Sequence, residues 1–345
     1  MEAWTDEFLL DESRHRVPGW AGSPLLLHQI LKGGSDRSYY RVVAHGQHTG
    51  PDSVILMVYT HVRPDNASFF AATDILRISG AHAPHIFFHD ETRRLAWIED
   101  LGQHDLWDHR VDVSTRSGLY AKALAQVSHL HRMDASELPD LLRRQLQPGF
   151  DAPYYGWEQE YFLQQFVARF SLASPTVDIK WAGHDELSCL RHDLAALPRF
   201  LVHRDFQSQN IMIRAGEAWL IDYQGLREGR PEYDVASLLY DPYVSLSGEE
   251  RRLLADGYFK LRAERDGWIT DPQTLAMCAC QRLMQALGAY GKLGIGDKKP
   301  SFLQHIQPAV ANLKQVLRAS GLLPSILPLL ELRPGAGHDV NDASA

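Results

Sequence analysis

Two aspartates and one asparagine stand close together in the chain with a spacing that suits metal and proton chemistry. Asp205 and Asn210 come before a short β-type run at residues 211–213. Asp222 directly follows a second run at 219–221. If the two runs pair as a hairpin, the three side chains meet at one end of it. Two carboxylates and a carboxamide suit Mg²⁺, and one carboxylate can stay free to accept a proton from a hydroxyl group.

The order of residues around these side chains is that of a phosphate-transfer loop. Residues 203–210 read His-Arg-Asp-x-x-x-x-Asn, and an Asp-containing metal motif follows at Asp222. Both motifs agree in order, spacing and strand context with those of phosphoryl-transfer enzymes. The competing interpretation is a buried His203 and Asp205 that brace a turn. It leaves the grouping of all three oxygen-bearing side chains unexplained.

With these motifs the sequence resembles the aminoglycoside phosphotransferase and choline kinase superfamily, whose fold is the protein-kinase-like bilobal one. The resemblance implies that Asp205 is the catalytic base and that His203 braces the catalytic loop. It also implies that Asn210 and Asp222 are magnesium ligands and that ATP is the co-substrate. Asp234 matches the structural acid of the helix that follows.

The elements that must position this loop change character along the chain. The first hundred residues alternate between strand-like and turn-like pieces, with one helical stretch between two predicted hairpins. From residue 114 onward the apolar spacing is helical, interrupted by the hairpin at 211–221. The predicted early elements are strands at 25–31, 39–43, 54–59, 86–88 and 95–98 and a helix at 66–79.

This organisation predicts an α+β fold, with a small antiparallel-sheet N-lobe and a larger, mostly helical C-lobe. The expected boundaries are a nucleotide-binding lobe at 1–98, a hinge at 99–103, a catalytic and substrate-binding lobe at 104–332 and a disordered tail at 333–345.

The N-lobe carries a candidate nucleotide site with one departure from the family pattern. A turn at Gly33, Gly34 and Ser35 could cradle phosphate oxygens with its backbone N–H groups, and in the hinge Glu99 and Leu101 would line the adenine pocket. The family expects a phosphate-pairing lysine on the third strand, but residues 54–59 contain none. Either the chain is a nucleotide-binding pseudokinase, or another cation replaces the lysine. The candidates for that cation are Lys32, Arg37 and Arg41.

Further features resemble the anomeric sugar kinases that phosphorylate N-acetylmuramate and N-acetylglucosamine at the C1 hydroxyl in cell-wall recycling. They are the Tyr-Tyr-Arg turn, the lysine-free third strand, Glu-Asp-Leu-Gly at the hinge and the helix at 280–290. Arg282 is suited to a lactyl carboxylate because its planar fork pairs two oxygens. The alternatives are another acceptor hydroxyl (aminoglycoside, choline-like or other sugar) and, for each candidate residue, a polar helix surface. Candidate contacts to sugar hydroxyls or the acetamide are Asp241, Tyr243, Gln281 and Gln285.

Composition restricts the partners. The 345 residues carry a net charge of −8, which argues against nucleic acid or an anionic membrane as main partner. The N-terminus shows no signal peptide, and the apolar runs are too short to span a bilayer. Three cysteines cannot form a disulfide framework and favour a reducing, cytoplasmic location. A monomer is expected, with an apolar stretch at 322–332 as the candidate for a dimer contact.

Overall fold

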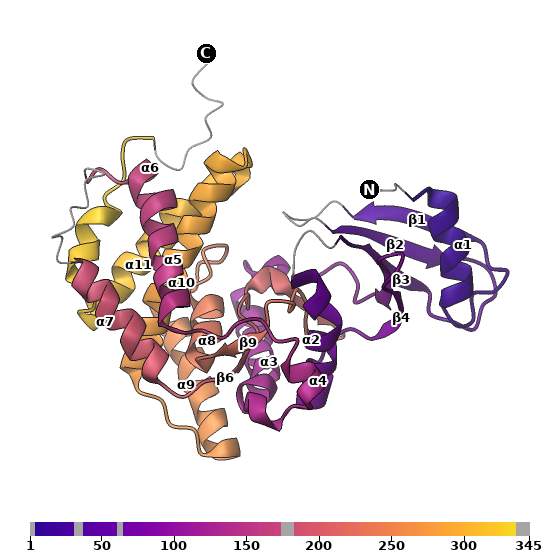
Figure 1. Cartoon of the computed structure of the whole chain (residues 1–345), viewed down its shortest axis with the longest axis horizontal. Coiled ribbons are helices and arrows are strands. Elements are labelled where there is room, and N and C mark those ends of the chain that lie inside the picture. Colours follow the sequence, from indigo (N-terminus) through magenta and orange to yellow (C-terminus); the bar gives the residue numbers. More distant parts are fainter. Residues whose placement is uncertain (1–3, 31–36, 61–64, 174–182, 336–345) are drawn as a thin grey trace, which may run out of the picture.

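The small lobe is built on a five-stranded antiparallel sheet (Figure 1). The structure, a computed structural model, describes residues 4–30, 37–60, 65–173 and 183–335, without the side chains of 65–67. The strand order β1-β2-β3-β5-β4 is that of a three-stranded meander, β1 to β3, joined to the β4–β5 hairpin by pairing of β3 with β5. The strands are β1 (Leu25–Ile30), β2 (Ser38–Ala44), β3 (Ser53–Val58), β4 (Ile86–Asp90) and β5 (Leu95–Glu99).

The two faces of the sheet bury different sets of side chains, because successive residues of a strand point to opposite sides. Leu56 pairs with Trp97 across β3 and β5, and both pack in the cluster that includes α1 (Asp6–Arg16). Their neighbours Met57 and Ala96 also pair and pack in the cluster shared with the large lobe. The predicted antiparallel N-lobe is confirmed.

Helix α1, which covers one face of the sheet, was absent from the predicted elements. Thr5 caps its first turn by accepting a hydrogen bond from the Phe8 N–H group at 3.2 Å. Ser13 anchors the helix to the sheet, since its hydroxyl accepts a 2.8 Å hydrogen bond from the buried Trp97 indole. The stretch is strongly polar, and its apolar side chains are too few to show a helical period.

The predicted helix at 66–79 is present as α2 (Asp65–Ser79). Its buried side chains Phe69, Ile75 and Leu76 belong to a cluster that also contains residues of the sheet and of the large lobe. In Figure 1 this helix lies beside α3 and α4, away from α1. It is therefore the element through which the two lobes share a core.

The large lobe is mostly helical. Its elements before the catalytic loop are η1 (Leu106–His109), α3 (Val113–His131), η2 (Ala135–Glu137), α4 (Asp140–Arg143), α5 (Ala152–Phe162), η3 (Leu163–Val167), α6 (Ala168–Phe170) and α7 (Gly183–Ala196). Those from the loop onward are β6 (Phe200–Val202), η4 (Ser208–Asn210), β7 (Ile211–Arg214), β8 (Glu217–Leu220), β9 (Arg227–Gly229), α8 (Pro231–Leu239), α9 (Gly248–Asp266), α10 (Pro272–Gly291), η5 (Lys292–Gly296), η6 (Pro300–His305), α11 (Ile306–Ser320) and η7 (Pro324–Leu330).

Two small sheets hold the catalytic segments inside this helical lobe. Strands β7 and β8 form the predicted hairpin. Its two-residue turn, Ala215 and Gly216, has positive φ at both positions, which gives the twist that such hairpins favour. Strand β6 pairs with β9, so the catalytic loop starts from a fixed strand end.

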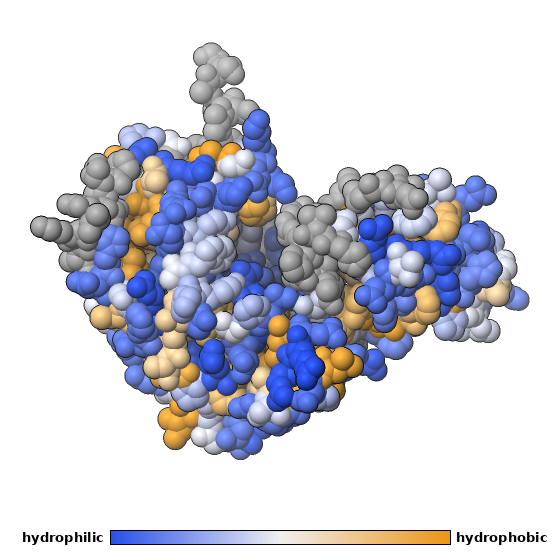
Figure 2. Space-filling view, in the orientation of Figure 1, coloured by the Kyte–Doolittle hydropathy of each residue, from blue (hydrophilic) through white to orange (hydrophobic). Residues whose placement is uncertain are grey.

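The surface is hollowed between the small lobe and the helices of the large lobe (Figure 2). Over the described residues, none of the helices has both the length and the apolar character required to cross a membrane.

Candidate active site

One buried carboxylate fixes the start of the catalytic loop. Asp234, in the first turn of α8, accepts hydrogen bonds from the backbone N–H groups of His203 at 2.6 Å and Arg204 at 2.8 Å. It also lies 2.9 Å from Nε2 of the buried His131. Burial lowers the pKa of His131 more than Asp234 raises it, so this imidazole is neutral at pH 7. The backbone at the start of the loop is thus held in place by Asp234.

Hydrogen bonds join the catalytic loop to the segment that carries Asp222. Nε2 of His203 lies 3.0 Å from the carbonyl oxygen of Ile221, and the Ile221 N–H group donates to the Asn210 carbonyl at 3.0 Å. The Asn210 amide donates to the backbone carbonyl of Asp205 at 2.9 Å. These bonds bring Asp205, Asn210 and Asp222 to the same end of the β7–β8 hairpin, as the spacing predicted.

Asp222 has an unusual backbone conformation, and its carboxylate is exposed. Its φ is +60°, in the left-handed region that is uncommon outside glycine, and its side chain is 46% exposed. The next residue, Tyr223, is fully buried, stacks on Phe69 of α2 and shares a 2.9 Å hydrogen bond with Thr73. The buried ring therefore holds the strained residue in place and links it to α2.

The environment of Asp205 keeps its carboxyl group ionised. Burial alone would raise the pKa of Asp205, but the charges of Arg204 and Arg282 outweigh burial and hold the pKa below its ordinary value. Arg204 forms an ion pair with the Asp205 carboxylate. Asp205 is thus a carboxylate at neutral pH, able to accept a hydrogen bond from a hydroxyl group.

Asn210 and Asp222 suit a magnesium ion by the chemistry of their donors. The Asn210 nitrogen is used within the loop, which leaves its side-chain oxygen available, and Asp222 presents a half-exposed carboxylate. Mg²⁺ is commonly held by one or two such oxygen ligands together with substrate phosphates. Across residues 4–335, apart from the gaps given above, no three His, Cys, Asp or Glu side chains form a metal cluster.

The predicted nucleotide residues fall in different places. Gly33, Gly34 and Ser35, and also Lys32, lie outside the described residues. Arg37 is buried, and its Nη1 lies 3.0 Å from the Gln224 side-chain oxygen and 3.8 Å from the Asp222 carboxylate.

Arg41 instead points to the hinge. Its guanidinium donates two hydrogen bonds to Asp100, at 2.6 and 3.0 Å, and one to the Gly102 carbonyl at 2.8 Å. Glu99 forms an ion pair with Arg214 of β7 and accepts a hydrogen bond from the His85 N–H group. Leu101 is buried. Of the two arginines, Arg37 is therefore the one beside the predicted magnesium ligands.

Two of the predicted substrate residues are engaged within the protein. Both oxygens of the buried Asp241 accept hydrogen bonds, one from the Ser208 N–H and hydroxyl groups and the other from the Tyr243 N–H group. Gln281 is fully buried against α5, where its amide donates to Glu158 and to the Tyr155 carbonyl. These contacts make Asp241 a support of the catalytic loop and Gln281 part of the helix core.

Of the other three, Arg282 is the one whose charge affects Asp205. Arg282 donates to the Ser237 hydroxyl at 3.0 Å and to the Gln285 side-chain oxygen. Its Nη2 atom makes no hydrogen bond to any of the described residues. Tyr243 packs edge-on against His305 with ring centroids 4.2 Å apart.

Three contributors to the site were missed from the sequence. Arg204 pairs with Asp205, Thr73 holds Tyr223, and Glu158 is a buried carboxylate beside Tyr233 and Gln281. Arg204 lies inside the catalytic motif, so its position was a readable signal. Thr73 and Glu158 are distant in sequence from their partners and carried none.

Comparison with known sequences agrees with this geometry. A model of the phosphotransferase enzyme family, which includes aminoglycoside phosphotransferases, matches residues 27–268. A relative from Pseudomonas putida, named N-acetylmuramate/N-acetylglucosamine kinase, is 25% identical over 96% of this chain and 94% of its own length. A relative of the same name from Pseudomonas aeruginosa is 22% identical over 89% of this chain and 91% of its own length.

Solved structures confirm the fold. A choline kinase from Cryptosporidium parvum aligns with a TM-score of 0.63 at 11% identity, over 92% of this chain and 99% of its own. An ADP-bound aminoglycoside phosphotransferase aligns with a TM-score of 0.55 at 12% identity, over 95% of this chain and 100% of its own. The predicted protein-kinase-like α+β fold is thereby confirmed.

Proposed function

Because the chain belongs to the phosphotransferase enzyme family, we propose that it transfers the γ-phosphate of ATP to the anomeric C1 hydroxyl of an N-acetylated amino sugar. N-acetylmuramate and N-acetylglucosamine are the proposed acceptors, and the reuse of cell-wall sugars in the cytoplasm is the proposed setting. The relatives named as kinases of these two sugars support the choice of acceptor. The observation that carries the proposal is the ionised carboxylate of Asp205, ion-paired with Arg204, at the same end of the β7–β8 hairpin as Asn210 and Asp222.

Asp205 would act by position more than by base strength. Its lowered pKa makes it a weak base, but an anomeric hydroxyl is more acidic than an ordinary alcohol. Phosphoryl transfer depends mainly on in-line placement and charge neutralisation. The carboxylate would orient the C1 hydroxyl toward the γ-phosphate and take its proton late. Mg²⁺, held by Asn210 and Asp222 when bound, would neutralise the phosphate charge.

Arg37 is the proposed replacement for the missing third-strand lysine. It is buried beside Asp222 and Gln224, so its charge sits where the phosphates of a magnesium-bound nucleotide would lie. Arg41 is committed to Asp100 in the hinge. A cation beside Asp222 argues against the pseudokinase interpretation, whose one support was the missing lysine.

Arg282 is the proposed contact for the lactyl carboxylate of N-acetylmuramate. Ser237 and Gln285 fix its orientation from two sides, and its Nη2 remains for an acceptor. The charge of Arg282 also lowers the pKa of Asp205, so a carboxylate bound to Arg282 would lie near the reacting hydroxyl. N-acetylglucosamine lacks this group, and Arg282→Gln should therefore impair N-acetylmuramate more than N-acetylglucosamine.

The test is an ADP-release assay with Mg·ATP and a panel of acceptors: N-acetylglucosamine, N-acetylmuramate, glucosamine, glucose, choline and kanamycin. Turnover of the N-acetyl sugars, with phosphate located at C1 by ³¹P NMR, is the expected result. Turnover of another acceptor alone would discard the sugar assignment and keep the phosphotransferase. Nucleotide binding without any product would favour the pseudokinase.

A further inference from the structure

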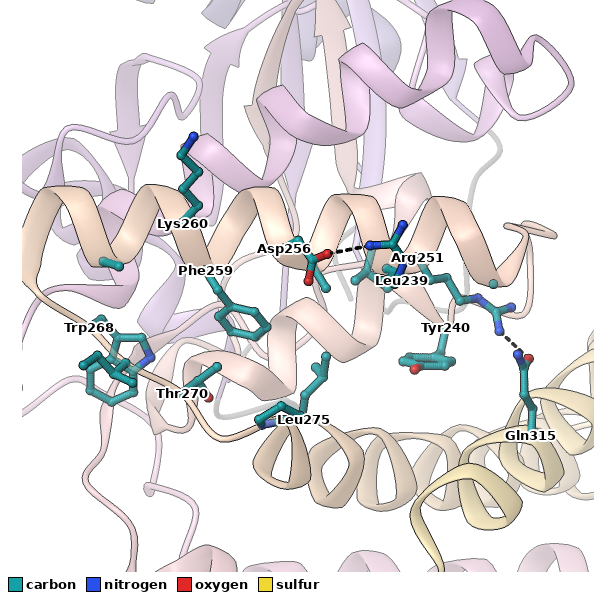
Figure 3. A pocket seen from close by; sticks show the side chains of 16 residues that line it. Leu239, Tyr240, Arg251, Asp256, Phe259, Lys260, Trp268, Thr270, Leu275 and Gln315 are labelled. Atoms are coloured by element: carbon teal, nitrogen blue, oxygen red, sulfur yellow. Dashed lines mark hydrogen bonds and ion pairs between the residues drawn. The ribbon is translucent and has the colours of Figure 1, made fainter.

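A second cavity lies in the large lobe, away from the catalytic loop. It has a volume of about 520 Å³ and opens between α9, the start of α10 and the ends of α8 and α11 (Figure 3). That volume lies in the range of small-molecule sites. No residue of segment 201–222 lines it. The residues used below are Tyr240, Arg251, Phe259, Trp268, Leu275 and Gln315, all of which line the cavity.

One end of the cavity holds a buried cation that forms no ion pair with the part of the chain that the structure describes. Arg251 is 7% exposed, and its guanidinium donates to the neutral side-chain oxygens of Gln315 at 2.8 Å and Asn312 at 2.7 Å. No carboxylate of the described residues lies within ion-pair distance of it. Its neighbour Glu250 is bound to Arg116, at 2.7 Å. Buried charges in proteins are normally paired, and this guanidinium has no anionic partner among the described residues.

Two buried donors of the lining residues also lack acceptors among the described residues. They are the Nε of Arg251 and the indole N–H group of Trp268, which lies at the other end of the cavity. Between these ends the wall is apolar, formed by side chains such as Phe259 and Leu275. The face of Tyr240 lies against the Arg251 guanidinium, 4.8 Å from its central carbon. The cavity thus has a cationic end, an apolar middle and a second donor.

We propose that this cavity binds a small amphipathic carboxylate. Its carboxylate lies against Arg251, and its apolar body runs past Phe259 and Leu275 toward Trp268. Burial lowers the pKa of Arg251, and an anionic partner would relieve that penalty. At the rim, Arg252 is paired with Asp256 and Lys260 with Glu264, so the positive charge that an anion would meet is that of Arg251. This site is independent of the proposed phosphotransfer.

The test is calorimetric titration of the full chain with two carboxylate probes, decanoate and 2-naphthylacetate, each against its uncharged alcohol. Saturable one-site binding of an acid, with its alcohol about tenfold weaker or more, is the expected result. Equal binding of acid and alcohol would overturn the anion site. Absence of saturable binding of both acids would overturn the proposal altogether.

Three variants locate the site. Arg251→Met keeps the aliphatic stem and should weaken acid binding by about thirtyfold or more. Arg252→Met, the matched control at the rim, should change it by about twofold or less, because its ion pair with Asp256 is exposed. Gln315→Glu supplies a carboxylate to Arg251 from the chain itself. It should raise the melting temperature of the ligand-free protein and abolish acid binding, and unchanged binding in Gln315→Glu would contradict the proposal.

Discussion

Burial and two positive charges shift the pKa of Asp205 in opposite directions. Burial disfavours its ionised form, while Arg204 and Arg282 favour it by more. The result is a carboxylate that stays charged although it is partly buried. Such a group attracts and orients a hydroxyl donor without binding its proton in the resting enzyme, which suits a reaction in which proton transfer comes late.

The change Asp205→Asn keeps the shape of the side chain and removes its ability to take a proton. Turnover of the acceptor sugar should fall by about 10²–10⁴-fold, while nucleotide affinity should change little. Steady-state kinetics and nucleotide titration check both parts. Asp193→Asn, at an exposed position of α7, is the matched control. Survival of turnover would show that another residue is the base.

Arg37 and Arg41 can be told apart by different readouts. Arg37→Met should lower kcat/KM for ATP by about 10²-fold or more, as expected for a lost charge-stabilising donor, with little change in unfolding. Arg41→Met should instead lower the free energy of unfolding, because it leaves Asp100 without its ion pair. Kinetics and urea denaturation of both variants separate the roles. The reverse pattern would place the phosphate cation at Arg41.

At the scale of elements, α2 contacts Tyr223, the residue after Asp222, by ring stacking on Phe69 and by a hydrogen bond from Thr73. Thr73 and Tyr223 join at 2.9 Å inside the core. Tyr223→Phe removes this bond and should cost about 0.5–1.5 kcal/mol of unfolding free energy. It should also raise the Mg²⁺ concentration needed for half-maximal activity, since Asp222 is the preceding residue.

A double-mutant cycle with Thr73→Val isolates the pair from other effects of each change. Thr73→Val alone should cost more than Tyr223→Phe, because it leaves a buried tyrosine hydroxyl without a partner. A coupling energy of zero would show that the contact does not link α2 to the loop.

The end of η6 carries a pH-sensitive group. Burial lowers the pKa of His305 to about 4, whereas the unfolded chain titrates near the ordinary value of 6.5. Between these values the unfolded state binds more protons, so stability falls as the pH is lowered. The slope from this residue approaches about 1.4 kcal/mol per pH unit. In His305→Met, the free energy of unfolding measured with urea should depend less on pH between 6 and 4.5. Equal slopes in the variant and the unchanged protein would show that His305 does not cause the pH dependence.

Most elements around the site could be predicted because their signals are local. The hairpin predicted from 211–213 and 219–221 is β7–β8, and the helix predicted at 66–79 is α2. Helix α1 was missed because it is polar on most sides. The hydrogen bonds that hold Asp241 and Gln281 within the protein could not be predicted, since their partners Ser208 and Glu158 come from other elements.

At the scale of the whole molecule, polar contacts at the hinge join the lobes. Asp100 accepts from Arg41 and, at 2.7 Å, from the Ser53 hydroxyl, and Glu99 pairs with Arg214 of the catalytic hairpin. Such contacts join residues up to 115 positions apart, which no local pattern reveals. The sequence motifs thus predicted candidate reacting groups, while the bonds that hold the lobes together required the structure.

Asp100→Asn tests this hinge. The neutral side chain leaves Arg41 without a counter-ion, and we expect a loss of about 3–5 kcal/mol in unfolding free energy. Nucleotide affinity should fall with it, because the proposed adenine pocket is formed by the same segment. Denaturation and nucleotide titration measure the two effects. Ser53→Ala, which removes a neutral partner of the same carboxylate, is the milder control.

In the sequence, helix α2 lies within the small lobe, but its side chains pack against both lobes. A gene divided at the hinge would therefore not yield two self-sufficient halves. The N-terminal product would expose Phe69, Ile75 and Leu76 to water, and the C-terminal product would lose the surface on which Tyr223 stacks. We expect such fragments to fold only when both are present. Gene recombination should therefore transfer this fold as a whole and not one lobe at a time.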